Sequence, residues 1–251
     1  MKTKEWKRNS VLVVLLLVTL LVVFNSTASA SNRMSKPVKV SNADNDLGTM
    51  VRKTANHTEY VTTDKQKIAE IIKRDNVVVP EGKTVISITT VMPNIDSDEE
   101  IENTVEISPK IKSPNTKGIV WLGFLVQNVV NQGNDCYYSD DIFHTTLGGP
   151  GGTIVQTIKD EISASMSCTV GVSAEVVSAK VGFNVTSTFS ISDAYSKILA
   201  PTETGAIKSW VLYNLKTYEV WNNWLIGQDT YETDGFALKP SGIMFRYYQY
   251  S

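Results

Sequence analysis

The chain has two histidines among its 251 residues, and they limit the catalytic chemistry that the sequence can offer. His144 follows Asp141 by three residues, and this pair could supply the base and the orienting acid of a Ser-His-Asp arrangement. The sequence has no Gly-x-Ser-x-Gly turn to present a nucleophile. His57 lies apart, in a polar segment. We therefore expect no catalytic residues and a protein that is not an enzyme.

The two cysteines, Cys136 and Cys168, are separated by 31 residues. In an exported protein two cysteines can form a lasting disulfide, and the alternative here is two unpaired buried thiols. No third cysteine competes for either partner, so two cysteines allow one intramolecular bridge. We predict a Cys136–Cys168 disulfide.

Oxygen ligands gather in an acidic segment, residues 93–103, which contains five carboxylates. Ca²⁺ takes six to eight oxygens, but the segment lacks the glycine and the ligand spacing of an EF-hand. We expect a solvated loop there, no metal site and no cofactor. The whole chain carries a formal net charge of −2 and has no basic block, which argues against nucleic acid as a partner.

The first thirty residues have the three parts of a secretory signal peptide. Basic residues precede an apolar run from Val11 to Phe24, and Ala28-Ser29-Ala30 ends the segment with small residues. The alternative, an uncleaved anchor, needs about 20 apolar residues. We predict cleavage near Ala30 and a secreted protein, whose net charge would be about −5 because the removed segment holds four basic residues and one acid.

The strongest periodic pattern lies in residues 162–192. Apolar residues occupy the even positions from Ile162 to Val176 and, apart from Ser187, the odd positions from Val177 to Ile191, with mostly Ser, Thr and Gly between them. A chain reversal at Val176-Val177 would bring both apolar sets to one face of a hairpin. Tilted membrane strands need only about 9–11 residues. The candidate membrane-facing residues are Val170, Val172, Ala174, Val176, Val177, Ala179, Val181 and Phe183.

In pattern and composition, this segment resembles the stem hairpin of the aerolysin-like β-pore-forming toxins. The resemblance implies a non-enzymatic, membrane-active protein whose stem exposes its polar face to water and its apolar face to lipid. An antiparallel sheet that covers a soluble core would show the same alternation. Val176-Val177 also lacks the Gly, Asn or Asp of favoured two-residue turns, so both interpretations remain open.

Aromatic residues concentrate near the C-terminus, where 11 of the chain's 22 lie between Trp210 and Tyr250. Tyr and Trp suit amphipathic recognition surfaces, although cross-strand pairs in a β core use them as well. Trp221 and Trp224 are the candidate binding aromatics. They support the alternative function, a soluble extracellular module that binds a cell-envelope glycan or a protein partner. The sequence leaves the oligomeric state undetermined.

Three short segments, Gly149–Thr153, Val177–Phe183 and Lys239–Gly242, resemble an uncharacterised group of secreted Gram-positive bacterial proteins. The resemblance extends over residues 118–251 and implies an extracellular bacterial setting. It assigns no functional residue.

These features must be positioned by a mainly β, antiparallel fold that we expect to be elongated or sandwich-like. One short amphipathic helix is predicted at residues 64–74, where Thr63 and Gln66 have the spacing of a capping box. The predicted organisation is a signal peptide at 1–30, a flexible lead-in at 31–58, a small helix-plus-strands region at 59–117 and an antiparallel β domain at 118–251.

Overall fold

The computed structural model describes residues 37–40, 47–95 and 121–251, and the predicted signal peptide lies outside these residues. The fold is mainly β and antiparallel, as predicted. No helix in the described part of the chain has the length and apolar character needed to cross a bilayer. The elements are β1 (Val38–Lys39), β2 (Thr49–Lys53), β3 (His57–Thr62), α2 (Lys65–Arg74), β4 (Val85–Pro93), β5 (Trp121–Tyr137), β6 (His144–Gly148), β7 (Gly152–Ser163), β8 (Ser165–Cys168), α3 (Ala174–Val181), β9 (Thr188–Leu199), β10 (Thr204–Trp224) and β11 (Thr230–Tyr250).

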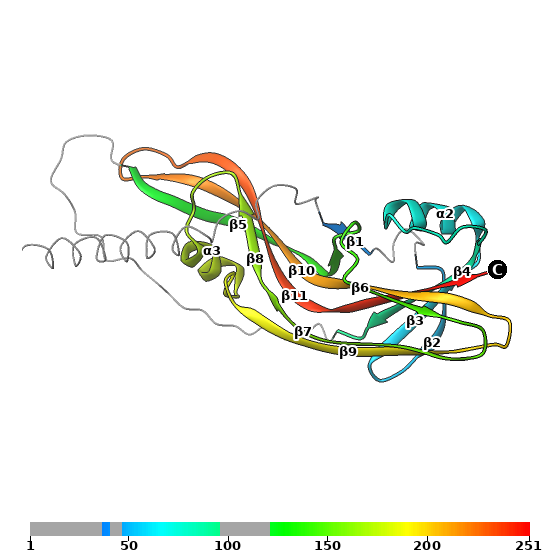
Figure 1. Cartoon of the computed structure of the whole chain (residues 1–251). Helices are drawn as coiled ribbons and strands as arrows, with labels where there is room; N and C mark the ends of the chain where they lie inside the picture. The colour runs from blue at the N-terminus through cyan, green and yellow to red at the C-terminus, as the bar shows by residue number, and fades with distance from the viewer. Residues whose placement is uncertain (1–36, 41–46, 96–120) are drawn as a thin grey trace, which may run out of the picture. The chain divides into compact units, whose positions relative to one another are not determined.

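A nine-stranded sheet in the order β1-β5-β10-β11-β4-β3-β2 forms the body, with β6 added to β10 and β8 added to β11 (Figure 1). Its centre is the β10–β11 hairpin, two strands of 21 residues each. At about 3.3 Å per residue, such strands reach roughly 70 Å. Their pairing runs from Thr204 opposite Tyr250 to Asn222 opposite Thr230.

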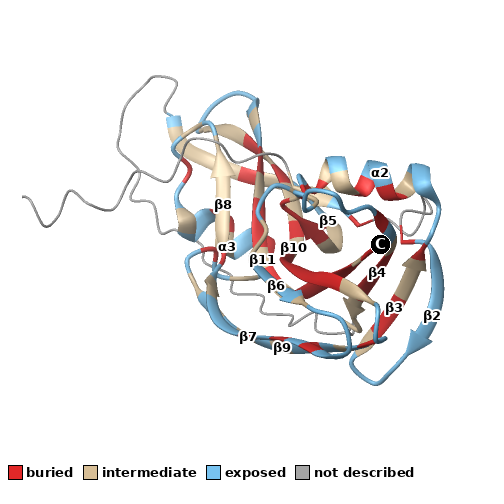
Figure 2. Ribbon diagram, turned by 45° about the vertical axis from the view of Figure 1, so that its right-hand side comes forward, coloured by how far each residue is buried: buried red, intermediate tan, exposed pale blue. Residues whose placement is uncertain are grey.

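A separate two-stranded sheet, the β7–β9 ribbon, lies against this body. Its register is regular from Gly152 opposite Leu199 to Ser163 opposite Thr188. One face packs Ile154, Ile158 and Tyr195 into a buried cluster with residues of β10 and β11. The other face is exposed, so the ribbon alternates between buried and exposed positions along its length (Figure 2).

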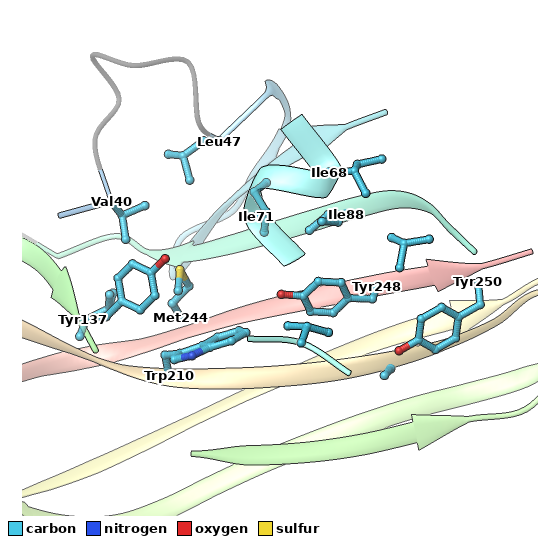
Figure 3. Packing of buried hydrophobic residues seen from close by; sticks show 14 residues of the cluster. Val40, Leu47, Ile68, Ile71, Ile88, Tyr137, Trp210, Met244, Tyr248 and Tyr250 are labelled. Carbon is cyan, nitrogen blue, oxygen red and sulfur yellow. The ribbon is translucent and has the colours of Figure 1, made fainter. Parts of the chain in front are cut away.

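The predicted helix is present as α2, one residue shorter than expected at its start. Asp64, and not Thr63, is the N-cap, and its Oδ1 accepts the Lys67 amide at 2.9 Å. Ile68 and Ile71 are buried on one helical face. Figure 3 shows them packed over the sheet in a cluster with Ile88, Trp210, Met244 and Tyr248.

The N-terminal organisation differs from our prediction. Within the predicted lead-in, residues 49–53 form β2 and residues 57–58 begin β3, because both strands find partners in a sheet edge that local sequence does not reveal. Strand β4 pairs with β11, so the predicted regions 59–117 and 118–251 contribute to one sheet. Most of the acidic segment, residues 96–103, lies outside the described residues.

The prediction of a Cys136–Cys168 disulfide is wrong, because both cysteines are free in this structure. Cys136 on β5 pairs with Tyr213 of β10, whereas Cys168 on β8 pairs with Gly235 of β11. The two lie on opposite sides of the β10–β11 hairpin, three strand spacings or about 14 Å apart across the sheet, and their levels along β10 (Tyr213 and Tyr218) differ by five residues. A disulfide requires Cα atoms closer than about 7 Å.

We therefore expect two free thiols in the native protein, with unequal reactivity. Burial, followed by the nearby Asp135 carboxylate, raises the pKa of Cys136 to about 11. At pH 8 only about one Cys136 thiol in a thousand would be ionised, and the thiolate is the reactive form. Ellman's reagent should modify Cys168 in the folded protein and Cys136 only after unfolding. A cross-linked peptide pair in unreduced digests would contradict this assignment.

Candidate functional site

Residues 162–192 do not form the predicted hairpin in this structure. They form the end of β7, the short strand β8, a loop, helix α3 and the start of β9. Helix α3 covers residues 174–181, where we predicted the strand reversal. Ser173 is its N-cap, and Gly182 ends it in the left-handed conformation at φ 78°. Those two residues are helix boundary signals that the stronger alternation concealed.

The candidate membrane-facing residues are therefore placed differently from our prediction. Val172, Val177 and Val181 are buried, whereas Val176 and Ala179 are exposed. Val170, Ala174 and Phe183 are half-buried and pack at the margin of the same core. This α3 cluster consists of Val126, Val172, Val177, Val181, Val185, Tyr218, Val220 and Ala237.

The β7–β9 ribbon has the two-faced character that was predicted for residues 162–192. Its outer face is rich in Ser and Thr, and its inner face contacts the body of the fold. The outer positions are Thr153, Val155, Thr157, Lys159, Glu161 and Ser163 on β7, with Thr188, Ser190, Ser192, Ala194, Ser196 and Ile198 on β9.

The ribbon register continues the sequence alternation without a slip. In every pair of opposed residues in the ribbon, such as Ser163 and Thr188, the two residue numbers add up to 351. Carried forward, the same register sets Ala174 opposite Val177, with Glu175 and Val176 as the turn. Every residue on the inner face from position 162 to the turn and back to position 189 is then apolar except Ser187. Our predicted hairpin had the same faces but was displaced by two residues in register.

The inner face of the ribbon buries one polar side chain, Gln156, that lacks a hydrogen-bond partner among the described residues. Gln156 is only 4% exposed, and neither its amide oxygen nor its amide nitrogen has a hydrogen-bond partner among the described residues. A buried polar group without a partner costs about 1–3 kcal/mol. Among the described residues, hydrogen bonding by the Gln156 side chain is thus not one of the interactions that hold the ribbon on the body.

A histidine–carboxylate pair also ties the ribbon to the body. His57 Nε2 on β3 lies 2.9 and 3.0 Å from the two carboxylate oxygens of Asp193 on β9. The pair borders an open hollow of about 470 Å³ lined by Thr54, Asn56, Thr157 and Ser192. His57 therefore contributes a contact between β3 and the ribbon. Its partner, 136 residues away, could not be found from sequence spacing.

The Asp141–His144 pair considered from sequence forms no comparable contact in the described residues. His144 is exposed on β6, and its ring meets Phe143 edge-on at 4.6 Å between centroids.

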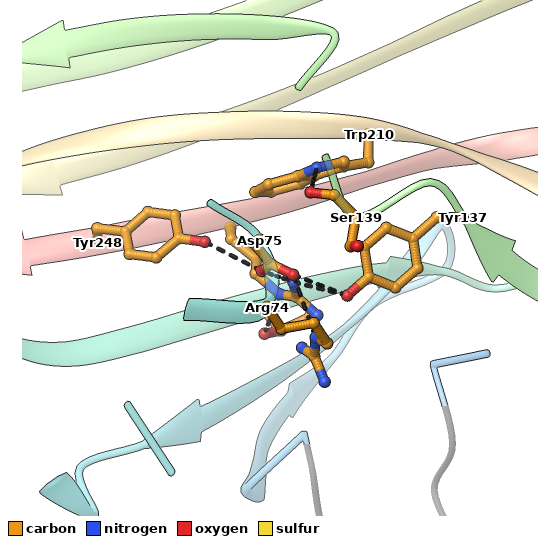
Figure 4. Close-up of polar contacts among 8 residues, drawn as sticks. Arg74, Asp75, Tyr137, Ser139, Trp210 and Tyr248 are labelled. Carbon is orange, nitrogen blue, oxygen red and sulfur yellow. Dashed lines mark hydrogen bonds and ion pairs between the residues drawn. The ribbon is translucent and has the colours of Figure 1, made fainter. Parts of the chain in front are cut away.

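The most extensive buried polar network joins helix α2 to the sheet (Figure 4). Arg246 Nη1 donates to Asp75 Oδ2 and, at 3.2 Å, to the Tyr137 hydroxyl. Tyr137 donates to Asp75 Oδ1 at 2.9 Å, and Tyr248 donates to Asp75 Oδ2 at 3.4 Å. The Arg246 guanidinium also lies 5.3 Å from the ring centroids of Tyr137 and Trp210.

The electrostatics of this network indicate a structural role. Burial alone would lower the pKa of Arg246, but the Asp75 carboxylate outweighs burial and raises it. Burial also raises the pKa of Tyr248 well above its ordinary value. Asp75 and Arg246 are sealed from solvent, so the charged pair has no access to a substrate.

The candidate binding aromatics lie at the far end of the long hairpin. Trp224 is the last residue of β10 and pairs with Trp121 of β5, while Trp221 pairs with Tyr231 of β11. Trp221 and Trp224 are half-buried. Other aromatics of the C-terminal region, including Trp210, Tyr247 and Tyr248, are core residues. Only part of the predicted aromatic concentration is thus available to a partner.

Comparison of the chain with models of protein families and with curated protein sequences finds no match.

Proposed function

We propose that this is a secreted, non-enzymatic protein that acts on membranes by extending the β7–β9 ribbon into a bilayer-spanning hairpin. The observation that carries the proposal is the register. The pairing already present in the ribbon, continued through residues 164–187, separates apolar from polar side chains along the segment with Ser187 as the one polar residue on the apolar face. The predicted signal peptide at residues 1–30 supports secretion.

The dimensions of the extended hairpin suit a bilayer. Residues 162–174 and 177–189 give 13 positions in each arm. At about 3.3 Å per residue, an arm would reach roughly 43 Å, which at a tilt of about 45° covers a hydrocarbon core of roughly 30 Å. Asp160, the first charged residue below this stripe on the inner face, would lie at the interface.

The conversion exchanges one apolar environment for another. Val172, Val177, Val181 and Val185 are buried in the α3 cluster, and all four would face lipid in the hairpin. Burying a valine contributes at least about 1.5 kcal/mol. Because the four valines would stay out of water in the extended hairpin, the conversion would not lose this contribution. The conversion would break the four-residue pairing of β8 with β11 and unwind the eight-residue helix α3.

The inserted hairpin would need partners of its own kind. Unpaired backbone groups at a sheet edge are not tolerated in hydrocarbon, where water cannot satisfy them. Several copies of the chain would therefore insert together and pair their hairpins edge to edge.

Two neighbouring residues of α3 give the decisive test. Ala179 and Lys180 are both exposed in this structure, but the extended hairpin would turn residue 179 to lipid and residue 180 to water. We expect an environment-sensitive fluorophore on Ala179→Cys to shift to shorter wavelength with phosphatidylcholine vesicles, as encapsulated dye escapes. The same label on Lys180→Cys is the matched control and should shift little. A Cys168→Ala background avoids labelling the accessible native cysteine.

The outcome separates the two interpretations of the alternating segment. If α3 persists on the membrane, both labels report the same change, or neither reports any, and the hairpin proposal fails. Vesicles that retain their dye while the protein stays folded would also contradict it.

A further inference from the structure

The end of the body that carries Trp121 and Trp224 has an exposed apolar surface that the extended hairpin does not use. We define the aromatic tip as residues 121–124 of β5 and residues 219–232 of β10, β11 and their turn. Leu225 and Ile226 in the turn are 46% and 62% exposed. Trp121 and Tyr231 beside them are 49% and 50% exposed. Several large apolar side chains exposed together mark an interaction site more often than isolated ones do.

The indoles of the tip are oriented by polar partners at its surface. Trp121 Nε1 donates to Asn222 Oδ1 at 3.1 Å, and Trp224 Nε1 donates to the Thr230 hydroxyl at 3.3 Å. Trp221 Nε1 donates to Glu219 Oε2 at 2.8 Å. Each ring thus has a polar edge with a partner and an apolar body, the arrangement that places Trp at a membrane–water interface.

The negative charge of the aromatic tip favours binding to some membrane surfaces over others. Residues 217–238 contain four carboxylates, Glu219, Asp229, Glu232 and Asp234, and no lysine or arginine. Residues 121–134 are uncharged. An anionic bilayer has a negative surface potential and would repel such a tip. The outermost group of a phosphatidylcholine head is a quaternary ammonium, which carboxylates attract and indole faces bind through cation–π contacts.

From exposure, indole orientation and charge, we infer that the aromatic tip docks on zwitterionic, phosphocholine-bearing membranes. Leu225 and Ile226 enter the interface, and the indoles and carboxylates meet the headgroups. The α3 cluster includes Val126 of β5 and Val220 of β10, with Phe124 of the tip packed against it, so docking by the tip brings α3 close to the membrane. The inference concerns attachment, a step separate from insertion.

Vesicle flotation measures this attachment whether or not dye escapes. We expect the protein to float with phosphatidylcholine vesicles and to bind at least about tenfold more weakly when Leu225 and Ile226 are both replaced by serine, given the apolar area removed. The matched control replaces Val78 and Leu147 by serine as well. These two residues lie elsewhere on the fold and are 80% and 72% exposed. That variant should float as the unmodified protein does. Adding phosphatidylserine should weaken binding.

Each contrary result overturns the docking surface. Unchanged flotation of the Leu225→Ser/Ile226→Ser variant would place attachment elsewhere, and stronger binding to phosphatidylserine vesicles would refute the charge argument. Retention on isolated cell-wall glycan without any flotation would assign the tip to a glycan partner. Flotation without dye release would leave the docking surface intact and count against the extended hairpin alone.

Discussion

Replacing Arg246 by methionine is expected to lower the free energy of unfolding by up to about 3–5 kcal/mol, because the buried Asp75 carboxylate would then keep only Arg74, whose side chain is 23% exposed, as a counter-ion. Arg246 is the buried counter-ion of Asp75, whose side chain is fully buried at the C-terminal end of α2, and Arg74 Nε is a second one at 3.1 Å. The loss would also free the Tyr137 hydroxyl of one partner. Urea denaturation of the purified protein, followed by circular dichroism, measures the change directly.

Two milder variants of the same region calibrate that result. Tyr248→Phe removes the 3.4 Å hydrogen bond to Asp75 and the interaction of the hydroxyl with Arg246, and should cost about 0.5–1.5 kcal/mol. Gln66→Ala removes an exposed contact with Glu70 on α2 and should stay within about 0.5 kcal/mol. If Arg246→Met were as mild as Tyr248→Phe, the network would not be what holds α2 to the sheet.

Local signals predicted the parts of this fold that local interactions determine. Helix α2 has its capping residue, its apolar spacing and its basic last turn within a dozen residues, so sequence alone located it, although we assigned the cap to Thr63 in place of Asp64. The buried pair of Asp75 and Arg246 joins positions 171 residues apart, and nothing near either residue indicates the other. The same limit applies to Cys136 and Cys168, whose separation follows from the strand order.

Residues 162–192 failed as a structure prediction for a different reason. The segment satisfies two periodicities at once, since Val177 and Val181, four residues apart, lie on one face of a helix and would also lie on one face of a strand. In the folded protein, tertiary packing selects the helix because both valines enter the α3 cluster. A sequence under no second constraint would not need such regular alternation through a helix and two loops. That surplus regularity supports the extended hairpin.

A disulfide that holds β8 on the body should stop membrane leakage reversibly. Ser167 on β8 lies opposite Phe236 on β11, and opposed antiparallel residues have Cα atoms about 4.5–5.5 Å apart, a separation that a disulfide can bridge. In a Cys168→Ala background, the oxidised Ser167→Cys/Phe236→Cys variant should release dye at less than about one tenth of its reduced rate, because β8 must leave β11 before the hairpin can extend.

The matched control places a disulfide within the ribbon, where the proposal keeps the same pairing in both states. Val155 and Ser196 are opposed on the exposed face of β7 and β9, so Val155→Cys/Ser196→Cys can be oxidised without touching the body. This variant should release dye equally well when oxidised and when reduced. Leakage that survives oxidation of the β8–β11 bridge would mean that β8 never leaves the sheet. Leakage abolished by oxidation of the ribbon bridge would mean that the β7–β9 register is not retained. Either result would rule out insertion by extension of the β7–β9 register. If the bridge between β8 and β11 blocks leakage only while it is oxidised, the release of β8 is a required step.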